Sequence, residues 1–93
     1  MRSVDTLEEL RAAVHRDPRG VAGAASKLAA AAREDDDLAS LSRSLAVLGR
    51  ARRSLGDIDL AESDLVAAVA AAETVGDEDL AADAHVGLAG VLA

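Results

Sequence analysis

Apolar residues recur three or four positions apart along most of this chain. Between positions 38 and 55 only Arg52 interrupts the pattern, which consists of Leu38, Leu41, Leu45, Leu48 and Leu55. The same spacing begins again at Ile58 and at Leu80, and it is also present across residues 4–14. Because an α-helix completes a turn every 3.6 residues, this spacing places the apolar side chains on one helical face and predicts four amphipathic helices.

A fifth helix is expected between positions 17 and 32, where Asp17-Pro18 provides a start signal. Proline is well tolerated in the first helical turn because its missing N–H has no partner there in any case. Gly20 and Gly23 weaken this helix by up to ~1 kcal/mol each relative to alanine. β-Branched and aromatic residues, which favour strands, are scarce. The sequence therefore predicts an all-α protein of about five helices.

One short phrase is repeated at the expected helix boundaries. Residues 56–61 read Gly-Asp-Ile-Asp-Leu-Ala and residues 76–81 read Gly-Asp-Glu-Asp-Leu-Ala, with a looser copy at residues 35–39. Glycine after an apolar run adopts the left-handed conformation that ends a helix, and a following aspartate accepts hydrogen bonds from the first amides of the next helix. Counted from Asp35, Asp57 and Asp77, the spacings are 22 and 20. Each interval is long enough for one helix and a tight turn, so consecutive helices should form antiparallel hairpins.

Residues 44–68, SLAVLGRARRSLGDIDLAESDLVAA, resemble a tetratricopeptide repeat of bacterial type. The resemblance rests on a Leu-Gly pair in the first helix, a Leu-Gly-Asp turn and an Ala-x3-Leu-x2-Ala pattern in the second helix. The residues that match are Leu45, Leu48, Gly49, Leu55, Gly56, Asp57, Ala61, Leu65 and Ala68. The resemblance implies helical hairpins stacked as an α-solenoid, with Gly49, Ala61 and Ala68 allowing paired helices to approach closely.

Three features depart from the family pattern. Arg52 replaces the usual aromatic residue, Glu73 stands where a closing proline is common, and the repeat distance is 40 to 42 residues rather than 34. HEAT-type repeats, which are ~40 to 47 residues long, are therefore the alternative. The expected organisation is one helical-repeat domain over residues 1–93. It comprises a degenerate hairpin (1–34), the best-matched hairpin (35–76) and the first helix of an incomplete repeat (77–93), whose Gly87 and Gly90 should pack against a following helix.

Composition and charge narrow the classes of partner. The net charge of −7 argues against nucleic acid and membranes, because both attract basic surfaces. The chain contains no cysteine, which removes thiolate metal sites and disulfides. Its first eighteen residues carry acids throughout and lack the apolar run typical of a signal peptide, and no apolar run reaches the ~20 residues of a membrane span. We expect a soluble cytoplasmic protein.

Arg43, Arg50 and Arg53 share one face of the third helix, with Ala46 between them. In the family that the chain resembles, the matching positions line a concave groove that holds peptides. Arginine pairs with carboxylates through two parallel hydrogen bonds, so this strip is a candidate site for an acidic peptide or protein. The alternative is an ordinary solvated face with weak ion pairs.

Neither catalysis nor metal binding is expected. The acidic runs at residues 34–37 and 77–79 lack the order of oxygen ligands in a calcium loop and are explained by helix capping. His15 and His85 have neither a nucleophile beside them nor metal-ligand spacing. We expect no cofactor and no enzymatic activity.

Three functions remain open from the sequence. The first is a scaffold module that binds a peptide or protein in its groove. The second is the regulatory N-terminal array of a larger effector such as a caspase-like CHAT protease. The third is a self-associating structural protein that forms a homo-oligomer through an open C-terminal helix, since a repeat helix without its partner leaves an apolar face exposed.

Overall fold

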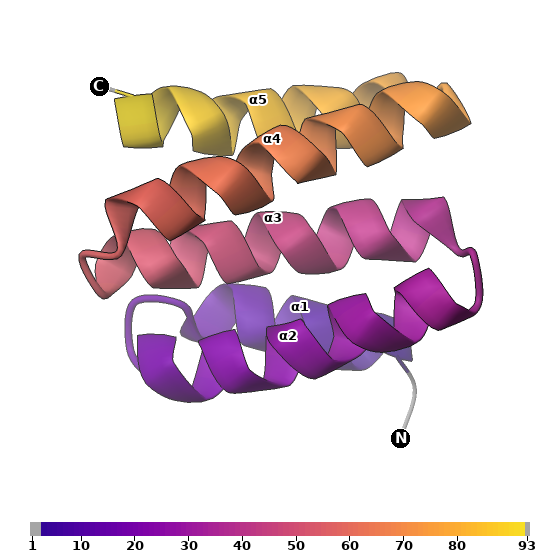
Figure 1. The fold of residues 1–93 in the computed structure, drawn as a ribbon. Helices are drawn as coiled ribbons and strands as arrows, with labels where there is room; N and C mark the ends of the chain where they lie inside the picture. Colours follow the sequence, from indigo (N-terminus) through magenta and orange to yellow (C-terminus); the bar gives the residue numbers. More distant parts are fainter. Residues whose placement is uncertain (1–2, 93) are drawn as a thin grey trace.

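The computed structural model describes the backbone of residues 3–92 and the side chains of residues 7–92. Within that range the chain forms five α-helices and no strand, which confirms the all-α prediction (Figure 1). The helices are α1 (Ser3–Ala13), α2 (Pro18–Glu34), α3 (Leu38–Ser54), α4 (Ile58–Val75) and α5 (Glu78–Leu92). The predicted boundary at Gly56-Asp57 is confirmed, because it lies between the end of α3 and the start of α4.

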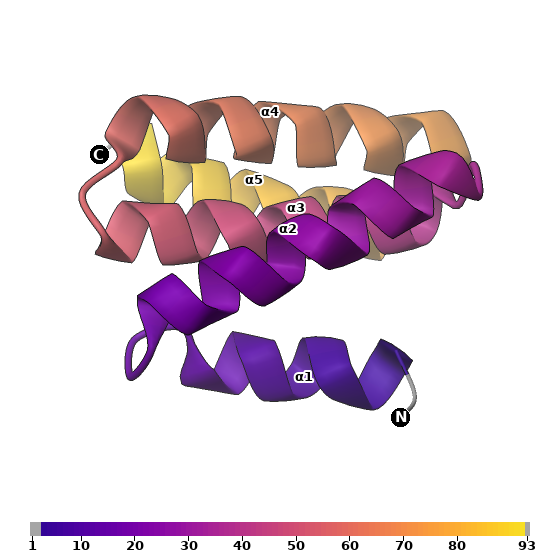
Figure 2. The same ribbon diagram turned by 60° about the horizontal axis from the view of Figure 1, so that its bottom comes forward.

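The α3 helix lies at the centre of the fold and contacts all four other helices. Each helix also packs against the next one in the chain, and α3 additionally contacts α1 and α5 (Figures 1 and 2). The described backbone measures 32 × 29 × 19 Å. Helices pack 8–10 Å apart, so the shortest dimension accommodates about two layers of helices. The α1 and α5 helices both contact α3 and line one side of it, and this side carries the candidate site.

The last three turns of the chain use the same backbone geometry. Each has one residue with positive φ, namely Asp36 (52°), Gly56 (85°) and Gly76 (81°). The amide of the next residue then donates to the carbonyl five residues earlier, at 2.9 Å (Asp37 to Ala32), 2.9 Å (Asp57 to Arg52) and 3.1 Å (Asp77 to Ala72). This bond is the Schellman closure of a helix C-terminus. A recurrent turn of this kind explains why the sequence repeats a glycine-aspartate pair.

The turns correct the alignment of the first copy of the phrase. Asp37, not Asp35, corresponds to Asp57 and Asp77, so all three intervals between the aspartates that precede α2, α3, α4 and α5 are 20 residues. Three of these side chains accept a hydrogen bond from the amide three residues later, at 3.1 Å in each case: Asp17 from Gly20, Asp37 from Ser40 and Asp77 from Leu80.

Asp57 does not cap α4 through its side chain, contrary to the expectation from the sequence. Its backbone carbonyl accepts from the amide of Ala61 at 2.9 Å, and its own amide closes the preceding turn. The junction between α3 and α4 is therefore held through the backbone of Asp57, without the carboxylate.

Leu65 of α4 is the centre of the core. Its side chain is fully buried and lies between Gly49 of α3 and Gly87 of α5. A Cβ atom at residue 49 would approach Leu65 Cγ to 2.6 Å, and one at residue 87 would approach Leu65 Cδ2 to 2.8 Å. Both distances are far below ordinary van der Waals contact. The two glycines therefore let α3 and α5 close around one leucine.

Candidate functional site

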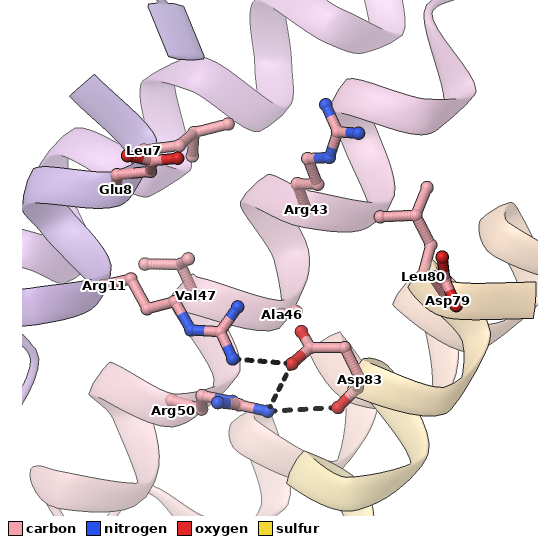
Figure 3. Close-up of a pocket in the computed structure, with 10 residues that line it drawn as sticks. All are labelled: Leu7, Glu8, Arg11, Arg43, Ala46, Val47, Arg50, Asp79, Leu80 and Asp83. Carbon is pink, nitrogen blue, oxygen red and sulfur yellow. Dashed lines mark hydrogen bonds and ion pairs between the residues drawn. The ribbon is translucent and has the colours of Figure 1, made fainter. Parts of the chain in front are cut away.

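A groove runs along α3 between α1 and α5, with a cavity volume of about 390 Å³ (Figure 3). The α3 helix forms the floor with Arg43, Ala46, Val47 and Arg50. The α1 helix forms one wall with Leu7, Glu8 and Arg11, and α5 forms the other with Asp79, Leu80 and Asp83. The i, i+3, i+4 and i+7 spacing on α3 aligns its four side chains on one helical face.

The predicted site residues do not all line this groove. Arg43 and Arg50 line it together with Ala46, whose side chain is buried in the floor. Arg43 is exposed and makes no ion pair with any side chain described between residues 7 and 92. Arg53 lines a neighbouring depression instead. Arg43 is therefore the member of the predicted strip that is most available to a ligand in the groove.

Arg50 belongs to an ion-pair network that joins the three helices that line the groove. The Asp83 carboxylate accepts from Arg11 Nη2 at 2.7 Å and from Arg50 Nη2 at 3.2 Å (Figure 3). Arg50 Nη2 also donates to the backbone carbonyl of Asp83 at 3.0 Å. Asp83 thus connects α5 to both α1 and α3, and it engages Arg50, one of the three arginines that the sequence had assigned to a ligand.

The sequence pattern missed Arg11 and Asp83, which lie 72 residues apart. No local motif could have brought them together, because their meeting depends on α1 and α5 flanking the same helix. Their presence changes the charge of the site. Arg11, Arg43 and Arg50 face three acids, Glu8, Asp79 and Asp83, so the groove has no net basic charge, although the sequence had indicated a basic strip.

The residues that carry the repeat resemblance line neither this groove nor the neighbouring depression. Leu45, Leu48, Gly49, Ala61, Leu65 and Ala68 are buried, and Leu55, Gly56 and Asp57 form the turn between α3 and α4. The interface between these two helices also contains polar pairs. The buried Ser42 hydroxyl donates to the Ala68 carbonyl at 2.8 Å, and Arg52 pairs with Asp64 at 2.8 Å.

Gly87 and Gly90 pack against earlier helices of the chain, whereas the sequence had suggested a following helix as their neighbour. Gly87 faces Leu65 and the Arg50 guanidinium, and a Cβ atom at residue 90 would approach Arg53 Nη1 to 2.8 Å. Two of the three predicted arginines therefore extend beneath α5 at the points where α5 has no side chain. Glycine at these positions allows α5 to lie close to α3.

Two carboxyl groups outside the groove have shifted pKa values. Hydrogen bonds from Ser40 lower the pKa of Asp37 below its usual 3.8. Burial raises the pKa of Asp64, and the hydrogen bond and charge of Arg52 oppose that shift. Both acids therefore influence how stability depends on pH, and neither belongs to the candidate site.

Comparison with known proteins identifies no relative: no family model, no curated protein and no solved structure matches this chain. Among the described residues, no group of three or more histidine, cysteine or acidic side chains is arranged to hold a metal ion. None of the described helices has the length and apolar character needed to cross a bilayer. The groove geometry is therefore the basis for a functional proposal.

Proposed function

We propose that this protein is an interaction module of tetratricopeptide-repeat type that binds a peptide segment of a partner protein in the groove over α3. The observation that carries this proposal is the groove itself, a cavity of about 390 Å³ lined by three helices. Its walls combine apolar side chains with charges of both signs. Such a lining suits a peptide, whose backbone and side chains present both apolar and polar groups.

Arg43 is the anchor we assign to an acidic side chain or to the terminal carboxylate of the peptide. Arg11 and Arg50 already share the carboxylate of Asp83, whereas Arg43 is exposed and has no described ion-pair partner. Arginine can bind a carboxylate through two parallel hydrogen bonds. Leu7 and Leu80 line the same groove and would contact apolar parts of the peptide.

Selecting peptides from a phage-displayed random library would test this function. The affinity of synthetic copies of the selected peptides would then be measured by fluorescence anisotropy. Replacing Arg43 by Glu should weaken binding by about tenfold or more, because charge-assisted hydrogen bonds are lost and a repulsive charge is introduced. The matched control is Arg19→Glu, which makes the same charge change at an exposed position in the first turn of α2. An acid is favourable there because it faces the positive end of the helix dipole.

The outcome distinguishes the groove from the remaining surface. Peptides that lose affinity for Arg43→Glu but not for Arg19→Glu would support binding in the groove. Equal affinity for both variants would place the binding site elsewhere. A library that yields no specific binder would refute the peptide-binding function.

A further inference from the structure

A second depression adjoins the groove and differs from it in charge. It has a volume of about 430 Å³ and is lined by Arg11 of α1, by Val14 and His15 of the turn after α1, by Arg50, Arg53 and Ser54 of α3, and by Val86 and Gly87 of α5. Arg11 and Arg50 also line the groove, so the two cavities lie side by side. No acidic side chain from the described part of the chain lines this depression. That is unusual in a protein with 17 acidic and 10 basic residues.

The arginines of the depression retain unused hydrogen-bonding capacity. Arg50 has five N–H donors, and the hydrogen bonds described above use Nη2 alone; its Nε has no described partner but is buried beneath Gly87. Arg53 is exposed and pairs with no carboxylate among the described side chains. Among the described side chains, Asp83 is the acid that pairs with Arg11 and Arg50, whereas Arg53 pairs with none. Counted over the groove and the depression together, four arginines face three acids. The excess charge is therefore positive.

The helix dipole by itself does not explain why arginines gather in this depression. Arg53 lies in the last turn of α3, where a cation is stabilised by the negative end of the helix dipole. That effect accounts for Arg53 but not for the absence of acids from the lining. The Ser54 hydroxyl and His15 Nδ1 share a hydrogen bond at 3.4 Å and add two further polar groups to the lining, one of which keeps a donor for an anion in either tautomer of His15.

We propose that this depression binds the phosphate group of a phosphorylated residue in the peptide that occupies the groove. Guanidinium groups bind phosphate oxygens through paired, charge-assisted hydrogen bonds, and a phosphomonoester provides three acceptor oxygens. Arg53 would be the principal contact, with Ser54 as a second donor and Arg50 completing the positive field. This inference rests on the proposed peptide-binding function for the source of the phosphate, but not for the existence of the anion site.

In the first experiment, inorganic phosphate is titrated into the full chain, and binding is monitored through ¹H–¹⁵N chemical shifts. The ionic strength is held constant, with chloride as the reference anion. Saturable shifts at Ser54, Gly87 and the side chain of Arg53 are expected. Arg53→Gln should weaken phosphate binding by about tenfold, because a guanidinium contact is replaced by a neutral amide. Arg19→Gln, which removes a charge from α2, should change it less than about twofold, since exposed charges at a distance are screened.

The second experiment uses the peptides selected for the groove, each with serine or phosphoserine at successive positions. Phosphorylation at one position should tighten binding by about tenfold, and Arg53→Gln should abolish that gain without changing the affinity of the unphosphorylated peptide. Arg53→Lys should retain part of the gain, because lysine keeps the charge but loses the planar fork.

The two proposals fail in different ways. If no peptide binds but inorganic phosphate saturates at Arg53, the peptide function is wrong and the depression is a site for free phosphate. If peptides bind but phosphorylation and Arg53→Gln have no effect, the phosphate inference is wrong. Unsaturable shifts spread over the surface cations would also overturn it.

Discussion

The contact between Gly49 and Leu65 makes a sharp prediction about the cost of a single methyl group. Glycine in a helix interior is normally less favourable than alanine by ~0.5–1 kcal/mol. At residue 49, however, the added methyl would lie 2.6 Å from Leu65 Cγ and 3.2 Å from the Ala61 carbonyl. Leu65 is fully buried, so its branch point cannot move aside into solvent.

Gly23 is the matched control. It lies within α2, is exposed, and a Cβ atom there would have no neighbour within 4 Å. Gly23→Ala should therefore stabilise the protein by ~0.5–1 kcal/mol, or raise Tm by about 4–8 °C per kcal/mol for a domain of this size. Gly49→Ala receives the same propensity gain but incurs an overpacking cost of ~1–3 kcal/mol, so we expect a net destabilisation of about 1 kcal/mol.

Urea denaturation followed by far-ultraviolet circular dichroism measures both free energies of unfolding, because the chain has no aromatic residue for fluorescence. A double-mutant cycle with Leu65→Ala isolates the contact. In that background the methyl at residue 49 has room, so the Gly49→Ala penalty should disappear, although Leu65→Ala itself costs ~2–5 kcal/mol. If Gly49→Ala stabilises the wild-type protein as much as Gly23→Ala does, the close approach of α3 and α4 described above is wrong.

Three further predictions concern polar groups. Ser42→Ala removes a buried hydroxyl and leaves an α4 carbonyl without that donor, so chemical denaturation should show a loss of about 1 kcal/mol; no loss would contradict the hydrogen bond. Asp77→Ala should lower the unfolding free energy by ~0.5–2 kcal/mol, because the Asp77 carboxylate caps α5. Asp57→Ala should cost clearly less in the same assay, because the Asp57 side chain does not cap α4. Equal losses would refute the difference in capping. The folded-state pKa of Asp64 is raised, so its favourable contribution is fully present below pH 3.8 and is lost as pH rises through the folded pKa. Wild-type stability should therefore fall relative to Asp64→Asn over that window, and a difference between the two proteins that is constant with pH would contradict the burial of this carboxyl group.

The number of helices and the places where they end could be predicted because they depend on neighbouring residues. Apolar spacing acts within one or two turns, and a positive-φ residue followed by an aspartate acts within a single junction. Even so, the local sequence did not decide which of the aspartates at positions 35–37 corresponds to Asp57 and Asp77. Asp36 takes the left-handed position there without glycine, and this shifted the alignment by two residues.

For the candidate site, the sequence predicted which residues share a face of α3 but not which side chains they meet. The face shared by Arg43, Ala46 and Arg50 follows from helical geometry, and the structure places all three in one groove. Which partners they meet does not follow from helical geometry, because Asp83 reaches Arg50 from a helix 33 residues away and Arg11 reaches Asp83 across 72 residues. Pairings over such distances depend on how whole helices lie against each other.

The sequence by itself determined a chain of five helices joined by tight turns, since short-range periodicity and turn chemistry suffice for that. Only the tertiary structure decided the charge of the surface over α3, because packing brings acids from α1 and α5 beside the arginines of the groove and leaves the depression around Arg53 without them. The physical reason is that Gly49 and Gly87 close α3 and α5 around Leu65, and that distant contact sets which side chains face one another.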